Sequence, residues 1–269
     1  MLRFLLLTSL AALVLAEPQP RYLEDAIGEE RVVGGEVARP NSCPGRSPLS
    51  VQIWKLLLPH LWRNPDQERM GHDCCSLCGQ FQDLACCSWR SHDINNHEGK
   101  EQYMSVSRVY IHPNWNPSSV AGGYDIALLR LSSDAVLNNY VQLANLPPSG
   151  QVLPHNHPCY ISGWGRTQTG GSLSAQLKQA YLPVVDHNTC TSYGWWGSNV
   201  KNTMVCAGGA SESGCQGDSG APRTAASTAS GWSTEVTSFV SSLGCNTYKK
   251  PTVFTRASAY ISWMNGIMG

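Results

Sequence analysis

The sequence predicts an all-β fold that ends in a helix, and three observations lead to this prediction. Glycine and proline are frequent, at 25 and 16 of 269 residues, which favours short elements joined by turns. Extended patterns bounded by turn residues occur within residues 102–145, 157–165 and 236–241. The final segment, ASAYISWMNGIM, spaces its apolar residues as a helix does. The length fits one two-lobed domain or two small ones.

The composition narrows the class of function. The chain is 42% hydrophobic and 14% charged, and its formal net charge is zero. A protein that binds nucleic acid or a membrane surface usually carries a basic excess. The sequence therefore predicts no nucleic-acid partner and no membrane partner.

The first 31 residues resemble an export signal and a propeptide. Residues 1–16 combine a positive charge at Arg3, an apolar run and a small residue at Ala16, as a cleaved signal peptide does. The run is too short to span a bilayer comfortably, and the alternative is a buried N-terminal helix. Residues 17–31 are polar and end at Arg31, so cleavage there frees an amine on Val32. We expect a secreted, extracellular protein with its domain in residues 32–269.

An oxidising compartment suits the eleven cysteines, although their odd number leaves at least one unpaired or joined to another chain. Spacing alone does not pair those of the first third or Cys159. These cysteines are Cys43, Cys74, Cys75, Cys78, Cys86, Cys87 and Cys159.

The segment SGCQGDSG places Ser219 in a glycine turn, which can project a nucleophilic hydroxyl into a cleft. The backbone N–H groups of Gly217 and Ser219 can hold an oxyanion at one point. The neighbouring Asp218 can bind the new ammonium of Val32, which would couple propeptide removal to assembly of the site. An ordinary turn is the alternative for this motif taken alone.

Several long segments resemble the chymotrypsin-like serine proteases, and most closely the pancreatic elastases. They include RVVGGEVARPNS, AGGYDIALLRL, PCYISGWGRT, SGCQGDSG and VTSFVSSLGCN. The resemblance covers residues 31–42 and 92–269, apart from 221–235. It implies two packed six-stranded antiparallel barrels with the catalytic groups in the cleft between them.

The resemblance also implies roles for single residues. Ser219 matches the nucleophile, and Asp125 matches the buried carboxylate that orients a base histidine. Ser238 matches a residue beside that aspartate. Ser213 matches the floor of the specificity pocket, which Val240 and Thr252 would narrow. These residues imply cleavage after small side chains.

Disulfides, cofactors and partners are implied in the same way. Cys190–Cys206 and Cys215–Cys245 match conserved bridges, whereas Ala225 stands where the partner of Cys159 is expected. Catalysis needs no cofactor. The implied partners are protein substrates, an activating trypsin-like protease and protein protease inhibitors.

The base histidine is missing, because residues 43–90 lack the family segments CGG and TAAHC. A shifted reading frame over residues 51–90 permits both segments. For example, the codons TGC-TGC-TCA-CTG-TGT for Cys74–Cys78 contain Ala-Ala-His-Cys out of frame. Residues 221–235 permit GPSNCRQHGQWVEHG in the other frame. We interpret both segments as frame-shifted and expect no compact fold from them.

The chain as it stands therefore carries a nucleophile and an orienting aspartate without a matched base. His72 lies near the missing position, but its flanks do not form the strand that would deliver it to Ser219. Ala221 and Glu235 replace glycines near the cleft, and the first barrel loses central strands. We expect impaired catalysis, and a non-catalytic pseudo-protease that binds peptides or inhibitors is the alternative.

Two metal hypotheses remain from the sequence. Residues 92–102, HDINNHEGKEQ, resemble the calcium loop of these proteases, with Asp93, Glu98 and Glu101 as oxygen ligands. Ser91 stands where a first carboxylate is expected, and a solvated acidic loop is the alternative. A zinc module built on His72 and the clustered cysteines is disfavoured, because adjacent cysteines cannot easily share one tetrahedral site.

Overall fold

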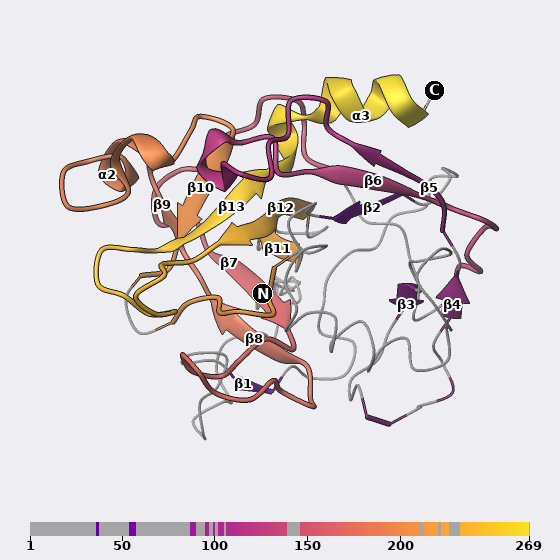
Figure 1. The fold of residues 1–269 in the computed structure, drawn as a ribbon, viewed down its shortest axis with the longest axis horizontal. Coiled ribbons are helices and arrows are strands. Elements are labelled where there is room, and N and C mark those ends of the chain that lie inside the picture. Colours follow the sequence, from indigo (N-terminus) through magenta and orange to yellow (C-terminus); the bar gives the residue numbers. More distant parts are fainter. Residues whose placement is uncertain are drawn as a thin grey trace, which may run out of the picture.

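The fold is a mostly β arrangement closed by a C-terminal helix (Figure 1). It comes from a computed structural model in which a defined set of residues can be described. These are residues 36–37, 54–57, 87–89, 95–96, 99, 102–104, 106–138, 146–209, 212–219, 222–225 and 232–268. The statements below concern these residues.

The largest sheet has eight antiparallel strands in the order β1-β8-β7-β11-β12-β13-β10-β9. Its strands come from both ends of the chain. They are β1 (Glu36–Val37), β7 (Cys159–Gly163), β8 (Lys178–Tyr181), β9 (Val184–Val185), β10 (Met204–Ala207), β11 (Pro222–Ala225), β12 (Trp232–Phe239) and β13 (Thr252–Arg256). Within the described residues β1 and β9 are the ends of this order, so the sheet is open there.

Two smaller sheets use residues from the first half. One has the order β2-β6-β5, with β2 (Trp54–Leu57), β5 (Val106–Ile111) and β6 (Ala127–Leu131). The other pairs β3 (Cys87–Trp89) with β4 (Gln102–Met104). Strands β2, β3 and β11 and the first residues of β12 lie in segments from which the sequence predicted no compact fold, and the described residues of these segments form short strands paired with their neighbours. Strand pairing uses backbone groups, so the free edges of β6 and β7 can pair segments whose side chains show no clear strand pattern.

Buried side chains divide into clusters that follow the sheets. Strand β7 alternates, with Cys159 and Ile161 buried and the residues between them partly exposed. Ile161 packs with Phe254 in one cluster of the large sheet. Strand β6 instead buries three successive residues at its start, Ala127–Leu129.

The C-terminal helix α3 (Ile261–Met268) covers the strands of the first half rather than those that precede it in sequence. Met264 of α3 and Tyr260 before it pack against Ile126 and Leu128. Figure 1 shows α3 beside β5 and β6. The helix therefore ties the end of the chain to the strand that follows Asp125.

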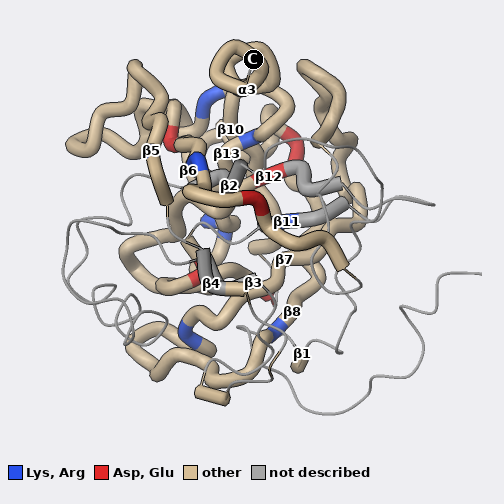
Figure 2. The backbone as a smooth tube through the Cα atoms, turned by 90° about the vertical axis from the view of Figure 1, so that its right-hand side faces the viewer, with Lys and Arg blue, Asp and Glu red and all other residues tan. Residues whose placement is uncertain are grey.

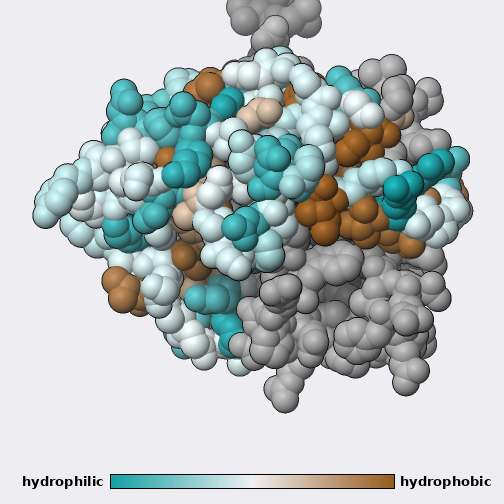
Figure 3. Space-filling model, turned by 45° about the horizontal axis from the view of Figure 1, so that its top comes forward, coloured by the Kyte–Doolittle hydropathy of each residue, from teal (hydrophilic) through white to brown (hydrophobic). Residues whose placement is uncertain are grey.

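The surface of the described part is mixed in character. Figure 2 shows Lys, Arg, Asp and Glu scattered along the chain rather than gathered on one face. Figure 3 shows hydrophobic side chains mainly on the side next to the grey atoms, and exposed Ile111 of β5 is among the apolar residues of the described surface. None of the described helices is long and apolar enough to cross a membrane.

Candidate active site

Asp125 lies at the end of a turn that leads into β6, and it is fully buried. Ser238 of β12 donates a hydrogen bond from Oγ to its Oδ2 at 2.6 Å. Thr255 of β13 donates from Oγ1 to its backbone carbonyl at 2.9 Å. Two strands of the large sheet thus hold Asp125, β12 through its carboxylate and β13 through its backbone, just before β6 of the smaller sheet begins. A buried carboxylate is costly unless hydroxyl or amide donors compensate the lost water, and the Ser238 hydroxyl is one such donor.

Ser219 follows a tight turn in the loop 212–219 and is half-buried. Gly217 has φ +97°, a conformation that favours glycine because a Cβ would crowd the backbone. The Cys215–Cys245 disulfide anchors the start of this loop to the segment after β12. Ser219 therefore projects from a loop that is fixed at its base.

Asp218, beside the nucleophile, is buried among backbone amides. Its two carboxylate oxygens accept hydrogen bonds from Gly165 N at 2.9 Å and from Cys215 N at 3.0 Å. Burial raises the pKa of Asp218 to about 6, and the two hydrogen bonds oppose that shift. Val32, its expected partner, lies outside the described residues.

The residues assigned to the specificity pocket lie together in part. Ser213 and Thr252 are both fully buried, and Thr252 Oγ1 accepts a hydrogen bond from Gly214 N at 2.9 Å. Within the described part of the chain, the Ser213 hydroxyl has no hydrogen-bond partner. Val240 is half-buried directly after β12. The segment 213–214 and the start of β13 thus contact each other.

The two strands that follow Ser219 in the chain carry an ion pair that the sequence did not predict. Arg223 of β11 and Glu235 of β12 are both buried, with Nε and Oε2 2.7 Å apart. The Arg223 guanidinium also donates to the Cys159 thiol at 3.1 Å and lies over the Phe254 ring. Burial raises the pKa of Cys159 to about 12, with Arg223 opposing, so this thiol is neutral at ordinary pH.

The Cys190–Cys206 disulfide also forms, at the end of the short helix α2 (His187–Cys190). Other sequence-predicted residues lie outside the described part of the chain. They are Arg31, Val32, His72, Ala221, and the proposed calcium ligands Asp93, Glu98 and Glu101. Among the described residues no group of His, Cys, Asp and Glu is arranged to hold a metal ion.

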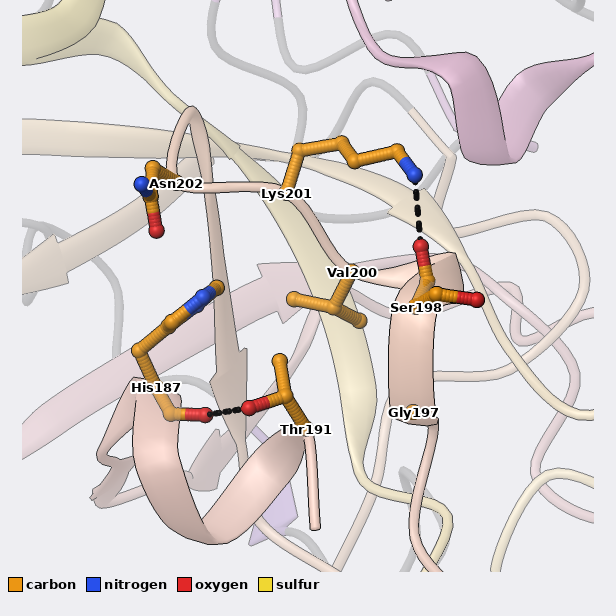
Figure 4. A pocket seen from close by; sticks show the side chains of 7 residues that line it. All are labelled: His187, Thr191, Gly197, Ser198, Val200, Lys201 and Asn202. Atoms are coloured by element: carbon orange, nitrogen blue, oxygen red, sulfur yellow. Dashed lines mark hydrogen bonds between the residues drawn. The ribbon is translucent and has the colours of Figure 1, made fainter.

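The four described histidines each have other neighbours. His112 stacks on Tyr124, and His155 contacts Asp186 with 3.1 Å between Nδ1 and Oδ2. Burial is the main cause of a lowered pKa at His157, and nearby Arg223 adds to it. His187 lines a surface cavity of about 570 Å³ (Figure 4). The residues around that cavity include none of those assigned to catalysis or specificity.

Comparisons with known proteins decide the family. The family model described as Trypsin matches residues 78–264. The chain belongs to the trypsin family of serine endopeptidases. It is 50% identical to chymotrypsin-like elastase family member 1 of Rattus norvegicus, over 88% of this chain and 90% of that protein. The same-named protein of Felis catus is 47% identical over 100% of this chain and 99% of its own length.

A further relative, the human chymotrypsin-like elastase family member 1, is 56% identical over only 66% of this chain and 69% of its own length. The resemblance to chymotrypsin-like elastases is therefore shown, and members of this family need no catalytic cofactor.

Sequence reasoning missed Thr255, Gly165 and Arg223. Thr255 contacts a residue 130 positions away, and no local pattern indicates that contact. Gly165 makes room for Asp218, because a Cβ built there would lie 2.4 Å from the carboxylate. Gly165 ends the segment SGWG, two residues after Gly163 closes β7, so a turn glycine was visible there in the sequence.

Proposed function

We propose that this chain is a secreted elastase-type serine protease zymogen that lacks its base histidine and therefore turns over substrate very slowly. The observation that carries the proposal is the buried Asp125, which accepts a hydrogen bond from the Ser238 hydroxyl. In the family this carboxylate orients an imidazole that takes the proton of the serine. No imidazole is matched to that role in this chain.

The proposed chemistry is acyl transfer. Ser219 would attack the carbonyl of a peptide bond, and the amides of Gly217 and Ser219 would hold the resulting oxyanion. Without a base, the Ser219 hydroxyl keeps its proton and is a weak nucleophile. Binding and the oxyanion site alone would leave a small residual rate.

The proposed specificity is for small side chains. A serine at position 213 carries no charge to select a basic residue, and buried Thr252 lies against the neighbouring Gly214. Val240 would further narrow the pocket. The edge of residues 238–240 would pair with an extended substrate or with a protein inhibitor.

Activation is proposed to follow cleavage after Arg31 by a trypsin-like protease. The new ammonium of Val32 would pair with Asp218, whose buried carboxylate now relies on two backbone amides. A relative named Proproteinase E, from Bos taurus, is 56% identical over 62% of this chain and 68% of its own length. Its name supports a precursor form.

The missing histidine is proposed to result from a frame slip. The family match begins at residue 78, the last residue of Cys74–Cys78, which would spell Ala-Ala-His-Cys out of frame. In a chain with that frame restored, we propose that both six-stranded barrels close. Restoring residues 51–90 would add two cysteines and restoring 221–235 a third, which with the five in matching regions are enough for four bridges.

Secretion and calcium binding belong to the same proposal. Residues 1–16 would direct export and would then be removed. In the proposed calcium loop, Gly99 has φ +74° and Asn95 and Asn96 are exposed, which suits a tight loop of oxygen ligands. Ser91 supplies no carboxylate at a position where the family pattern has one.

The test is hydrolysis of a chromogenic peptide with alanine before the scissile bond. The full chain and a matched chain with residues 51–90 in the restored frame are both treated with trypsin. We expect the unaltered chain to be at least about 10⁴-fold slower. Equal rates would refute the proposal, and Ser219→Ala in the restored chain controls for contaminating protease.

The pseudo-protease alternative is tested by binding. It requires the trypsin-treated full chain carrying Ser219→Ala to bind a small-residue peptide amide, which needs no bond to the serine. Calorimetry would measure that binding without any turnover.

A further inference from the structure

The turn that carries Asp125 has an unusual backbone. Gly123 and Tyr124 precede it with φ +91° and +61°. A left-handed tyrosine is uncommon, because its Cβ crowds the following carbonyl. Asp125 lies at the centre of a three-residue turn, in which the Ile126 amide donates to the Tyr124 carbonyl at 2.8 Å. The direction of the Asp125 carboxylate thus depends on a conformation that tyrosine does not favour by itself.

Tyr260 holds this turn from the other end of the chain. Its hydroxyl oxygen accepts a hydrogen bond from the Tyr124 amide at 3.1 Å, and it also hydrogen-bonds Thr203. Tyr260 is 4% exposed. Its own amide donates to Ala257, and its carbonyl accepts from Met264 of α3, both at 2.9 Å. The acceptor is therefore fixed between the short 3-10 helix η4 (Ala257–Ala259) and α3.

Ring contacts hold the Tyr124 side chain in the same conformation. His112 stacks on Tyr124 with 4.8 Å between ring centroids. The Tyr260 and His112 rings meet edge to face with 5.5 Å between their centroids, and the Trp263 ring of α3 has its centroid 5.0 Å from that of His112. The rings thus brace Tyr124, although its other face remains exposed.

The Tyr260 hydroxyl also interacts electrostatically with the Asp125 carboxylate. Burial is the main cause of the raised pKa of Tyr260, its hydrogen bonds to Thr203 and Tyr124 oppose the rise, and the charge of Asp125 adds to it. The phenol therefore stays protonated, and its oxygen remains available to the Tyr124 amide.

We propose that Tyr260 is a positioning residue for Asp125. Its hydroxyl fixes the left-handed turn at Tyr124, and that turn aims the Asp125 carboxylate at Ser238. The inference rests on the proposed role of Asp125 as the carboxylate that orients the base. It assigns the end of the chain a function in the site beyond covering β5 and β6.

The first test is a double-mutant cycle in the full chain, using Tyr260→Phe and Ser238→Ala. If Tyr260 aims Asp125 at Ser238, loss of the Ser238 hydroxyl matters less once the turn has relaxed. We expect Ser238→Ala to shift the urea midpoint less than half as far in the Tyr260→Phe background. Equal shifts in both backgrounds would overturn the proposal.

The second test is hydrogen exchange at the Tyr124 amide. Tyr260→Phe should speed its exchange about five- to tenfold, the effect of one lost hydrogen bond. Met264→Leu alters the same cluster, and Tyr181→Phe removes an exposed hydroxyl elsewhere. Neither control should change that amide, and an unchanged rate in Tyr260→Phe would also overturn the proposal.

A rescue separates positioning from packing. Glycine adopts left-handed φ without steric cost, so Tyr124→Gly should restore the full effect of Ser238→Ala in the Tyr260→Phe background. Failure to restore it would mean that Tyr260 acts through packing alone. These measurements need no turnover, so they can fail or succeed independently of the hydrolysis test for the proposed function.

Discussion

The sheet is held together differently on the two sides of Ser219. Before it, the Cys215–Cys245 disulfide anchors the loop, and Asp218 is satisfied by two backbone amides. After it, β11 and β12 bury the oppositely charged pair Arg223 and Glu235 in the sheet. The first side follows the elastase pattern, whereas the second lies in the segment proposed to be frame-shifted.

The difference concerns how a buried carboxylate is stabilised. Asp218 relies on neutral backbone donors, which are present whatever the side chains are. Glu235 relies on a cation, and burial still raises its pKa, with Arg223 and Arg256 opposing. A buried ion pair gains little net stability but is costly to break. The second side therefore depends on two side chains matching each other.

The largest effect is expected where that match is broken. Arg223→Ala would leave Glu235 buried without its cation and should lower the free energy of unfolding by about 3 to 5 kcal/mol. Urea denaturation of the full chain measures this, with exposed Arg130→Ala as the control. The double change Arg223→Met with Glu235→Leu, which replaces the pair with apolar side chains of similar volume, should be neutral or stabilising. A double variant as unstable as Arg223→Ala would refute this account of the pair.

A covalent link should make the second side resemble the first. Ala225 of β11 is directly opposite Cys159 of β7, and Cys159 is a free thiol. Opposed residues of antiparallel strands lie within disulfide range. Ala225→Cys should form that bridge and raise the free energy of unfolding by about 2 to 4 kcal/mol. Thiol counting and urea denaturation with and without reductant would show it, and no gain under oxidising conditions would contradict it.

The first side should make the stability of the chain depend on pH through Asp218. Asp218 has a pKa of about 6 in the folded chain against 3.8 normally, so the folded state holds its proton more tightly than the unfolded state. Stability of the uncleaved chain should therefore fall as pH rises from about 4 to about 6, by up to about 3 kcal/mol. The free energy of unfolding of the parent minus that of Asp218→Asn, measured at each pH, isolates this effect. A rise in that difference over the same range would mean that a cation already pairs with Asp218.

The sequence predicted much of the fold where local pattern and long-range packing agree. Helix α3 and strand β7 lie within segments whose spacing predicted a helix and a strand, and β12 overlaps the predicted strand 236–241 over residues 236–239. The charged side chains of Arg223 and Glu235 suggest a solvent-exposed position when read alone. Their burial depends on the register of β11 against β12, where the two are directly paired. That register is a property of the assembled sheet.

The candidate site shows the same division. Asp125 and Ser219 stand in recognisable segments, and Ser238 could be named by resemblance. The support given by Tyr260 comes from 136 residues away, and no local pattern indicates it. Contacts of this kind follow from packing α3 against β6, which the sequence of either element does not specify.

The smallest of these effects tests how closely the first side is packed. A Cβ at Gly165 would lie 2.4 Å from the Asp218 carboxylate, closer than any real contact, so one of them must move. Gly165→Ala should lower the free energy of unfolding by about 2 kcal/mol, because the packed loop cannot yield freely. Gly266→Ala is the matched control, since a Cβ there meets nothing within 4 Å and α3 should gain about 0.5 to 1 kcal/mol. If both changes were equally harmless in urea denaturation, Asp218 would not be held as tightly as its amide contacts indicate, and the contrast between the two sides of Ser219 would weaken.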